Sequence, residues 1–380
     1  MSPKKILFIL HEDSQSGAPN ALLSFLNYLK MNYNNIFSFD IFVLNSHGKF
    51  GLEKELKNVS NQFYKKNKKK AFFSKLLNVF SSNIKLILIK NKYDLIYGNT
   101  IVTLKTLDKI KRKNKNIKIL LHVHESQYLC SLLLNRKIAI DQFDSIDRIL
   151  TVAKFSADNL IKNYHVEPEK ITIIHPTVEK ERPPENNPLT TVYKEFDLVL
   201  TNIGHPNLTK GTELIPQIAS LLRNRNPKLK FKILVVGILN DNEYIKAIKL
   251  DIYKLNLDNY IELIPHTNQP LNYLAVANAY LITSREDSFS LMGLQAALFE
   301  KPIINFKNAI GLSDILDKTC TFQADYLNIN DFVEQIELVY NNPELVNQKT
   351  ALAKQKCDEL LDLEKSNQKH YEELKKFINS

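Results

Sequence analysis

Short apolar runs recur along the chain, and a longer amphipathic segment follows most of them. The runs are nearly continuous in Val, Ile and Leu, as expected for strands that are buried on both faces of a parallel sheet. Alternation of such runs with helix-length segments predicts βα units. The predicted strands are Ile6–Leu10, Phe39–Leu44, Leu95–Tyr97, Ile117–Val123, Arg148–Val152, Ile171–Ile174, Leu198–Ile203, Phe231–Val236, Tyr260–Ile264, Ala279–Thr283 and Pro302–Phe306.

A proline-rich break interrupts this series between Pro176 and Pro188, with the charged run Glu179–Arg182 inside it. Proline continues neither a helix nor a central strand, so the break predicts a linker. We therefore expect an α/β protein with two doubly wound parallel-sheet domains that face a cleft, at residues 1–180 and 181–355. A helical tail is expected at residues 356–380.

Composition narrows the class of protein. The 380 residues are 44% hydrophobic and 24% charged, which argues against collagen, coiled coil and wholesale disorder. Three cysteines are too few for a disulfide framework or a paired-cysteine metal site, which predicts a reducing, cytosolic compartment. The first apolar run is too short for a signal peptide. No charge-free run reaches the roughly 18 residues of a membrane span.

A formal net charge of +10 permits an anionic partner, and the first half carries the excess. The segment from Lys65 to Lys92 holds nine lysines and no acid. The segment from Lys105 to Lys118 holds seven basic residues and a single acid, Asp108. The apolar residues between these runs could share one helix face: Phe72, Phe73, Leu76, Leu77, Val79 and Phe80. An anionic bilayer surface and an ordinary solvated face both explain this pattern. The basic runs lack interleaved aromatic residues, which argues against nucleic acid.

Two candidate sites lie in the first half. The turn at Gly17 and Ala18 opens a helix after the first strand, but it matches neither a G-x-G-x-x-G nor a P-loop, and a plain tight turn also explains it. His122 and His124 end a later strand, where ligands of doubly wound sheets bind. The H-x-H spacing permits a metal ion, but no further ligand cluster lies nearby in sequence, so we predict none.

Two further candidates lie in the second half. After the strand at Leu198–Ile203, Lys210 precedes a predicted helix, where the helix dipole disfavours a cation unless it meets an anion. A solvated lysine is the alternative. In Ser284–Ala297 acidic residues precede a helix, and the amides of Phe289–Leu291 at its start could hold phosphate. An ordinary helix cap at Asp287 or Ser288 competes with that interpretation.

In their order along the chain these parts resemble the family 4 retaining glycosyltransferases of GT-B architecture, over nearly the whole sequence. Lys210-Gly211 matches the family's Lys-Gly, and the most specific match is Ser284–Leu291 followed by Lys301–Ile304. Other matching segments are Ser16–Pro19, Tyr93–Thr100, His122–Glu125, Ala153–Ser156 and Val166–Ile171.

The chain departs from the family at two places. The family usually has two glutamates eight positions apart, and these positions are Asp287 and Gln295 here, with Glu286 as an alternative for the first. An amide can still hydrogen-bond a ribose hydroxyl, but it carries no charge. Where the family often has an arginine after the glycine that matches Gly204, this chain has His205. Both departures bear on donor affinity more than on the fold.

The resemblance implies transfer of a sugar, with retention, from a nucleoside-diphosphate sugar to a hydroxyl acceptor. It implies no metal and no cofactor beyond that sugar nucleotide. Residues 1–180 would bind the acceptor, beside His124 and the Gly17 turn, residues 181–355 would bind the donor, and the helix at 356–380 would return toward the first domain. The implied catalytic residues are His124, Lys210, Asp287 and Glu286. The implied donor-binding residues are Gly17, Ala18, Gly204, His205, Lys210, Pro265, His266, Thr267, Phe289, Ser290, Leu291 and Gln295.

The expected partners are the donor, a glycan or glycolipid acceptor and an anionic membrane surface, but not nucleic acid. Cell-surface polysaccharide or glycolipid assembly is the expected role, in the cytoplasm or peripheral on the inner face of the cytoplasmic membrane. Two alternatives stay open. A sugar-nucleotide 2-epimerase shares the architecture, but we find no convincing carboxylate pair for its proton transfer. Gln295 and His205 favour a non-catalytic, sugar-nucleotide-binding relative.

Overall fold

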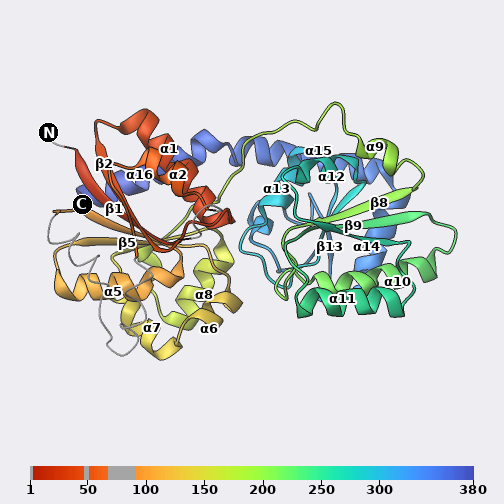
Figure 1. The fold of residues 1–380 in the computed structure, drawn as a ribbon, viewed down its shortest axis with the longest axis horizontal. Coiled ribbons are helices and arrows are strands. Elements are labelled where there is room, and N and C mark those ends of the chain that lie inside the picture. Colours follow the sequence, from red (N-terminus) through yellow and green to blue (C-terminus); the bar gives the residue numbers. More distant parts are fainter. Residues whose placement is uncertain (1–2, 47–50, 67–90) are drawn as a thin grey trace. The chain divides into compact units, whose positions relative to one another are not determined.

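The chain forms two compact units in the computed structural model, which describes residues 3–46, 51–66 and 91–380 (Figure 1). The first unit comprises Met1–Pro176 together with Glu364–Ser380, and the second comprises Thr177–Leu363. The change of unit at Pro176 falls at the start of the proline-rich segment, four residues before the predicted boundary at 180.

The first unit is built on a parallel sheet of seven strands in the order β3-β2-β1-β4-β5-β6-β7. The direction of winding reverses between β1 and β4, which defines the switch point of a doubly wound sheet. The strands are β1 (Lys4–Glu12), β2 (Phe37–Asn45), β3 (Phe63–Lys65), β4 (Leu95–Asn99), β5 (Lys118–Val123), β6 (Arg148–Thr151) and β7 (Ile171–Ile173).

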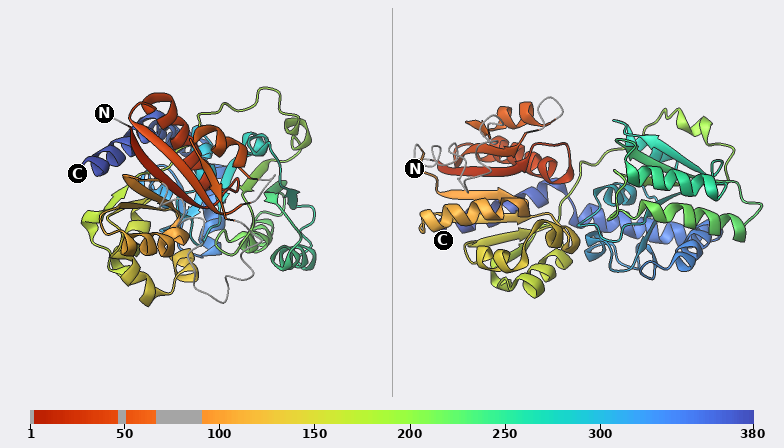
Figure 2. Two further views of the ribbon diagram at one scale, coloured as in Figure 1. Left: turned by 60° about the vertical axis from the view of Figure 1, so that its left-hand side comes forward. Right: turned by 60° about the horizontal axis from the view of Figure 1, so that its bottom comes forward.

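Helices cover both faces of this sheet because successive residues of its strands point to opposite sides (Figure 2). Ile6, Phe8 and Leu10 of β1 pack in one core with α1 (Gly17–Tyr33), α2 (Glu53–Val59) and α16 (Leu363–Asn379). Leu7 and Ile9 pack in the other core with α5 (Leu104–Lys113), α6 (Gln127–Leu133), α7 (Arg136–Phe143) and α8 (Lys154–Tyr164). Short 3₁₀ turns lie at η3 (Ile101–Thr103) and η4 (Pro168–Lys170).

The second unit repeats this design with six parallel strands in the order β10-β9-β8-β11-β12-β13, and its switch point lies between β8 and β11. The strands are β8 (Leu198–Ile203), β9 (Phe231–Ile238), β10 (Ile261–Pro265), β11 (Ala279–Ile282), β12 (Ile303–Phe306) and β13 (Phe322–Ala324). The helices are α9 (Leu189–Val192), α10 (Ile215–Arg225), α11 (Glu243–Lys254), α12 (Pro270–Val276), α13 (Leu291–Leu298), α14 (Ile329–Asn341) and α15 (Pro343–Leu360), with 3₁₀ turns η5 (Thr212–Leu214) and η6 (Gly311–Asp314). In Figure 1, α10 and α11 lie on one face of the sheet and α12 on the other.

The predicted α/β class with two doubly wound parallel sheets is confirmed, and each predicted apolar run is a strand. The prediction missed β3 and β13. Both have three residues and lie at a sheet edge, so neither needs a long apolar run.

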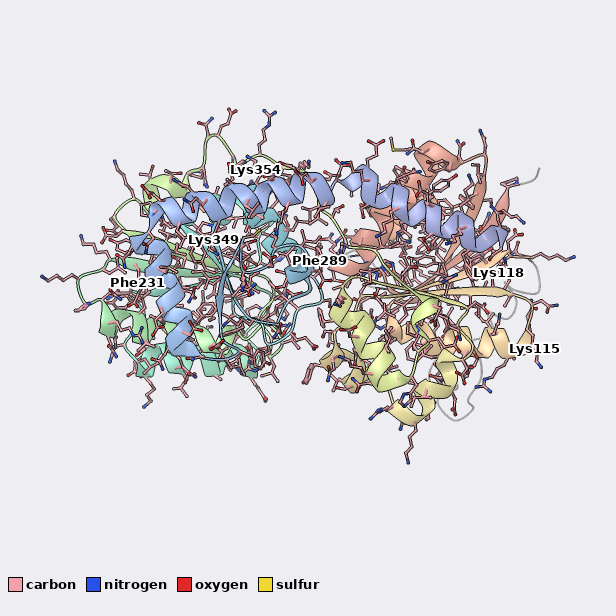
Figure 3. All side chains as sticks on the ribbon, turned by 180° about the vertical axis from the view of Figure 1, so that it is seen from behind. Lys115, Lys118, Phe231, Phe289, Lys349 and Lys354 are labelled. Atoms are coloured by element: carbon pink, nitrogen blue, oxygen red, sulfur yellow. The ribbon has the colours of Figure 1, made fainter. Side chains whose placement is uncertain are left out.

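The C-terminal segment is helical from Pro343, as α15 in the second unit and α16 in the first. Helix α16 is anchored at its last turn by Lys118, whose Nζ donates to the carbonyls of Phe377 and Ile378 at 3.0 and 3.1 Å (Figure 3). Within the described residues, no helix is both long enough and apolar enough to cross a bilayer.

Candidate functional site

The candidate donor residues of the second unit gather at its switch point. His205 and Lys210 lie in the loop after β8, and Glu286 and Asp287 lie in the loop after β11, the strand beside β8. Carboxyl ends of adjacent parallel strands on either side of a switch point form the ligand crevice of doubly wound sheets. Residues far apart in sequence therefore meet at one end of this sheet.

The loop that carries Lys210 is held rigidly against β11. The Thr283 hydroxyl donates to the Lys210 carbonyl at 2.9 Å, and the Arg285 amide donates to the Thr209 carbonyl at 2.8 Å. Gly211 has φ +61°, and a Cβ there would lie 2.1 Å from the Thr283 carbonyl oxygen. Only glycine permits this approach. The family-like Lys-Gly pair thus has a structural reason for its glycine. The first turn after it is 3₁₀, and the α-helix begins only at Ile215.

Lys210 and Asp287 form the charged centre of this site. Lys210 Nζ lies 2.6 Å from Asp287 Oδ2, and the side chain of Asp287 is mostly buried. The other carboxylate oxygen accepts from the amides of Phe289 and Ser290, at 3.4 and 3.2 Å. Two of the three amides that the sequence assigns to a phosphate therefore point to Asp287 in this structure. Their role toward a donor stays a prediction.

A second ion pair braces the same loops. Arg285 contacts the Glu213 carboxylate, which also accepts from the Tyr244 hydroxyl. That hydroxyl lies 2.9 Å from the Asn207 carbonyl, and burial raises the Tyr244 pKa. Sequence reasoning missed Glu213 and Tyr244. The sequence offers only a weak indication of them: an acid in η5 and a tyrosine in α11, with no motif that pairs the two.

Two of the predicted donor residues carry a buried polar atom that lacks a partner in the described part of the chain. Gln295, on α13, is 3% exposed, and its Nε2 meets no hydrogen-bond partner in the described part of the chain. The same holds for Nδ1 of His205. Buried polar groups are almost always paired, so orphaned ones indicate a ligand or water position. Both residues stand at positions where the sequence departs from the family.

The remaining predicted donor residues are spread around this end of the sheet. Gly204 directly follows β8 with φ +146°, and a Cβ there would meet open space. Phe289, labelled in Figure 3, is buried in the loop that leads into α13. Ser290 holds the left-handed conformation just before Leu291 begins that helix. Pro265, His266 and Thr267 lie at the end of β10, an edge strand separated from β8 by β9.

The first unit has its own polar cluster at the switch point between β1 and β4. Gly17 and Ala18 open α1 after β1, and Asn99 ends β4. Asn99 Nδ2 donates to the Ala18 carbonyl at 3.2 Å, while its Oδ1 lies 2.9 Å from His124 Nε2. Asn99 therefore connects the predicted helix turn to the predicted histidine. Sequence analysis quoted Asn99 within a family segment but assigned it no role.

The hydrogen bonds of Asn99 determine the tautomer of His124. Because Oδ1 only accepts, His124 Nε2 carries the proton and Nδ1 keeps a lone pair. Burial lowers the His124 pKa to about 4, so the ring is neutral near pH 7. A neutral ring with a free lone pair can accept a hydrogen bond from a hydroxyl. Its low basicity makes it a poor general base.

Glu125 is a second residue without an assigned role. Its Oε2 accepts from the amides of Ile101 and His124, both at 3.0 Å, and ties the turn after β4 to the turn after β5. Burial raises the Glu125 pKa to about 7. The carboxyl group fixes the backbone on which His124 stands.

Two further expectations concern metal and membrane. Over residues 3–46, 51–66 and 91–380, no three His, Cys, Asp or Glu side chains are grouped to hold a metal ion. Most of the basic run from Lys65 to Lys92, including Lys68–Lys70 and the apolar residues Phe72–Phe80, lies outside the described residues. In the described basic run, Lys111 pairs with Asp147 and Arg112 with Asp108.

Two parallel-sheet units, each with polar loops at its switch point, make up the GT-B architecture. Comparison with known families agrees. The model "Glycosyltransferase Family 4" matches residues 37–182, and "Glycosyl transferases group 1" matches residues 191–356. The chain belongs to the family 4-type glycosyltransferases of GT-B architecture.

Individual relatives are distant. An uncharacterized glycosyltransferase of Haemophilus influenzae is 25% identical over 159 residues, 42% of this chain and 44% of that protein. A D-inositol 3-phosphate glycosyltransferase of an Arthrobacter species is 23% identical over 209 residues, 53% of this chain and 49% of that protein. These matches span under half of either relative. Anabaena HepE in complex with UDP and glucose superposes with a TM-score of 0.81 at 15% identity, over 98% of this chain and 100% of HepE, which shows the shared fold.

Proposed function

We propose that the protein transfers a sugar, with retention at the anomeric carbon, from a nucleoside-diphosphate sugar to an acceptor hydroxyl. The observation that carries the proposal is the cluster at the second switch point. There a lysine held by Asp287 shares its loop with His205, and Gln295 lies on α13, the helix that follows the Asp287 loop; both His205 and Gln295 carry a buried polar atom without a partner in the described residues. Lysine charge suits a diphosphate, and the amide of Gln295 suits a ribose hydroxyl.

Charge stabilisation of the leaving group is the core of the proposed mechanism. The bond from the anomeric carbon to the diphosphate oxygen breaks, and a bond to the acceptor oxygen forms on the same face. Lys210, with help from His205, offsets the charge that develops on the diphosphate, and such electrostatic stabilisation is usually the largest catalytic contribution. The acceptor proton goes to the departing phosphate oxygen. No step uses a metal ion.

The first unit supplies orientation in this proposal. The lone pair on His124 Nδ1 accepts a hydrogen bond from a sugar hydroxyl, and the Gly17 turn with Asn99 shapes the surrounding surface. Because the His124 pKa is about 4, the ring orients the sugar and does not remove its proton. The substrate that reaches this unit would be a glycan or glycolipid hydroxyl.

A donor screen tests the proposal. UDP-glucose, UDP-galactose, UDP-N-acetylglucosamine and GDP-mannose are each examined for thermal stabilisation and for release of the nucleoside diphosphate. A donor that binds only the folded chain raises apparent stability by RT ln(1 + [L]/Kd). We expect one donor to bind and turn over, with product of unchanged anomeric configuration by NMR and the same rate in EDTA. Binding without turnover would indicate a non-catalytic relative, and neither result with any donor would overturn the proposal.

We further propose that the enzyme acts at an anionic membrane surface in polysaccharide or glycolipid assembly. The net charge of +10 supports this location. Each lysine near an anionic leaflet contributes about 1 kcal/mol. Sedimentation with anionic and with neutral liposomes is the test. We expect salt-sensitive pelleting with the anionic vesicles alone, and no pelleting with either would reject membrane binding while leaving the transferase proposal intact.

A further inference from the structure

The C-terminal helix α16 brings an imidazole into the core of the first unit. His370 is 5% exposed, and its ring stacks on Phe25 of α1 at a centroid distance of 3.5 Å. Its Nε2 lies 3.0 Å from the hydroxyl oxygen of Tyr97 on β4. The last helix of the chain is therefore joined to the central sheet by a polar contact inside an otherwise apolar core.

The Tyr97 hydroxyl bridges two histidines. Tyr97 is fully buried, and its oxygen lies 2.7 Å from Nδ1 of His122 on β5 in addition to the contact with His370. A phenol has one proton, so it donates to one ring and accepts from the other. Burial lowers the pKa of His122 and brings that of His370 to about 3, which keeps both rings neutral. The tautomers of the two rings are thus coupled through one hydroxyl.

His122 in turn supports His124. His122 lies in β5 and His124 directly follows that strand, and the centroids of the two rings are 4.0 Å apart. Asn99 holds the Nε2 edge of His124, and the His122 ring lies against its face. An unbroken series of contacts therefore runs from α16 to His124, by way of Tyr97 and His122.

We propose that Tyr97 and His370 are positioning residues for His124, so that α16 is a working part of the first unit's site. The inference rests on the proposed function for the role of His124 in orienting a sugar. The contacts that connect His370, Tyr97, His122 and His124 are independent of that role. A merely structural α16 needs apolar contacts alone, which Tyr371, Leu374 and Phe377 already provide. A polar bridge that ends at His370 adds nothing to burial. It does fix the orientation of the rings beneath His124.

Replacement of one hydroxyl tests the proposal. Tyr97→Phe keeps the ring and removes both bridge contacts. Tyr93→Phe is the matched control, because the buried Tyr93 just before β4 donates to Asp40 of β2 at 2.7 Å and has no hydrogen bond or ring contact with these histidines among the described residues. Long-range ¹H–¹⁵N NMR of the histidine rings reports each tautomer. We expect Tyr97→Phe to change the His122 tautomer and to shift the His124 ring signals, while Tyr93→Phe leaves both unchanged.

Rescue by a conservative variant separates positioning from folding. Gln at position 370 can still donate to the Tyr97 oxygen, whereas Leu cannot. We expect His370→Gln to keep the wild-type His124 signals and His370→Leu to shift them. With UDP-glucose as the donor, the rate of UDP release should fall about tenfold in Tyr97→Phe and His370→Leu but not in Tyr93→Phe or His370→Gln, because misplacement of a positioning group costs rate.

The two kinds of measurement keep the outcomes distinct. Unchanged His124 ring signals in both Tyr97→Phe and His370→Leu would overturn the inference. The NMR result needs no substrate, so it stands whether or not the protein transfers sugar. If the wild-type protein releases no nucleoside diphosphate from any donor of the screen, the proposed function is overturned and the ring geometry is judged by NMR alone.

Discussion

The two switch points of this protein differ in the charge of their side chains. In the second unit the site consists of formal charges, Lys210 with Asp287 and Arg285 with Glu213, in loops that water partly reaches. In the first unit it consists mainly of uncharged groups, with His124 held between the Asn99 amide and the His122 ring. Both sites occupy the same topological position on similar sheets, so the difference comes from side chains and not from fold.

The contrast assigns different tasks to the two sites. A partly exposed lysine paired with an aspartate can offset the charge of a diphosphate. A buried neutral imidazole has lost its basicity but offers a fixed lone pair, which suits the orientation of a hydroxyl. The comparison therefore predicts that substitutions in the second unit affect the leaving group, and that acid affects the first unit.

The largest expected effect concerns Lys210. Lys210→Ala should lower kcat by roughly 100-fold or more at saturating donor, by analogy with the loss of one oxyanion donor. Lys210→Arg should recover part of the rate, because the charge is retained. Steady-state kinetics with UDP-glucose or another donor from the screen provides the measurement.

Lys249→Ala is the matched control for that substitution. Lys249 also pairs with an aspartate in the second unit, Asp241 at 2.8 Å, but at an exposed surface. It should turn over like the wild type, since exposed ion pairs contribute little. Normal kcat in Lys210→Ala would remove Lys210 from the reaction and with it the contrast between the two sites.

The next effect is a loss of stability of the first unit in acid. The His370 pKa is lowered to about 3 and the His124 pKa to about 4, so the folded state binds fewer protons than the unfolded state below pH 6.5. Their stabilising effect is complete above pH 6.5 and is lost as the pH falls. Glu125, with its pKa raised to about 7, acts in the opposite direction between pH 4.5 and 7. Several histidines oppose one carboxyl, so stability should fall on acidification.

Hydrogen exchange of the β5 amides, followed between pH 6.5 and 5.5, measures this loss after correction for intrinsic exchange rates. Between pH 6.5 and 5.5 each histidine with a fully lowered pKa contributes about 1 kcal/mol, because one pKa unit is worth about 1.4 kcal/mol and the unfolded imidazole is only half protonated at pH 6.5. His370→Gln should reduce the loss by about that amount. A free energy of unfolding that stays constant or increases as the pH falls from 6.5 to 5.5 would contradict the buried and neutral character of these histidines.

Sequence patterns predicted the sheets well and the site only in part. Parallel strands that are buried on both faces need apolar runs, so β1, β8 and the strands beside them can be predicted from the sequence. The roles of Asn99, Glu125 and Tyr97 could not be predicted from the sequence. Each acts through a partner that is distant in sequence or on the adjacent strand, and only the folded sheet brings the pair together. The same is true of Lys210 and Asp287, 77 residues apart.

The smallest expected effect tests the orphaned amide of Gln295. If Nε2 awaits a donor hydroxyl, Gln295→Leu should raise the Kd for UDP about fivefold, the equivalent of about 1 kcal/mol for one hydrogen bond. It should not lower the melting temperature, because it removes a buried polar atom that has no partner among the described residues.

Gln323→Leu is the control. Its Nε2 donates to Thr321 at 3.1 Å on an edge strand of the same unit, so this variant should lose stability and keep its affinity for UDP. Calorimetric titration with UDP and thermal melts of both variants distinguish the two patterns. An unchanged UDP affinity in Gln295→Leu would show that the donor site of this chain does not use the position where its family carries a glutamate, and the charged site of the second unit would then rest on Lys210 and Asp287 alone.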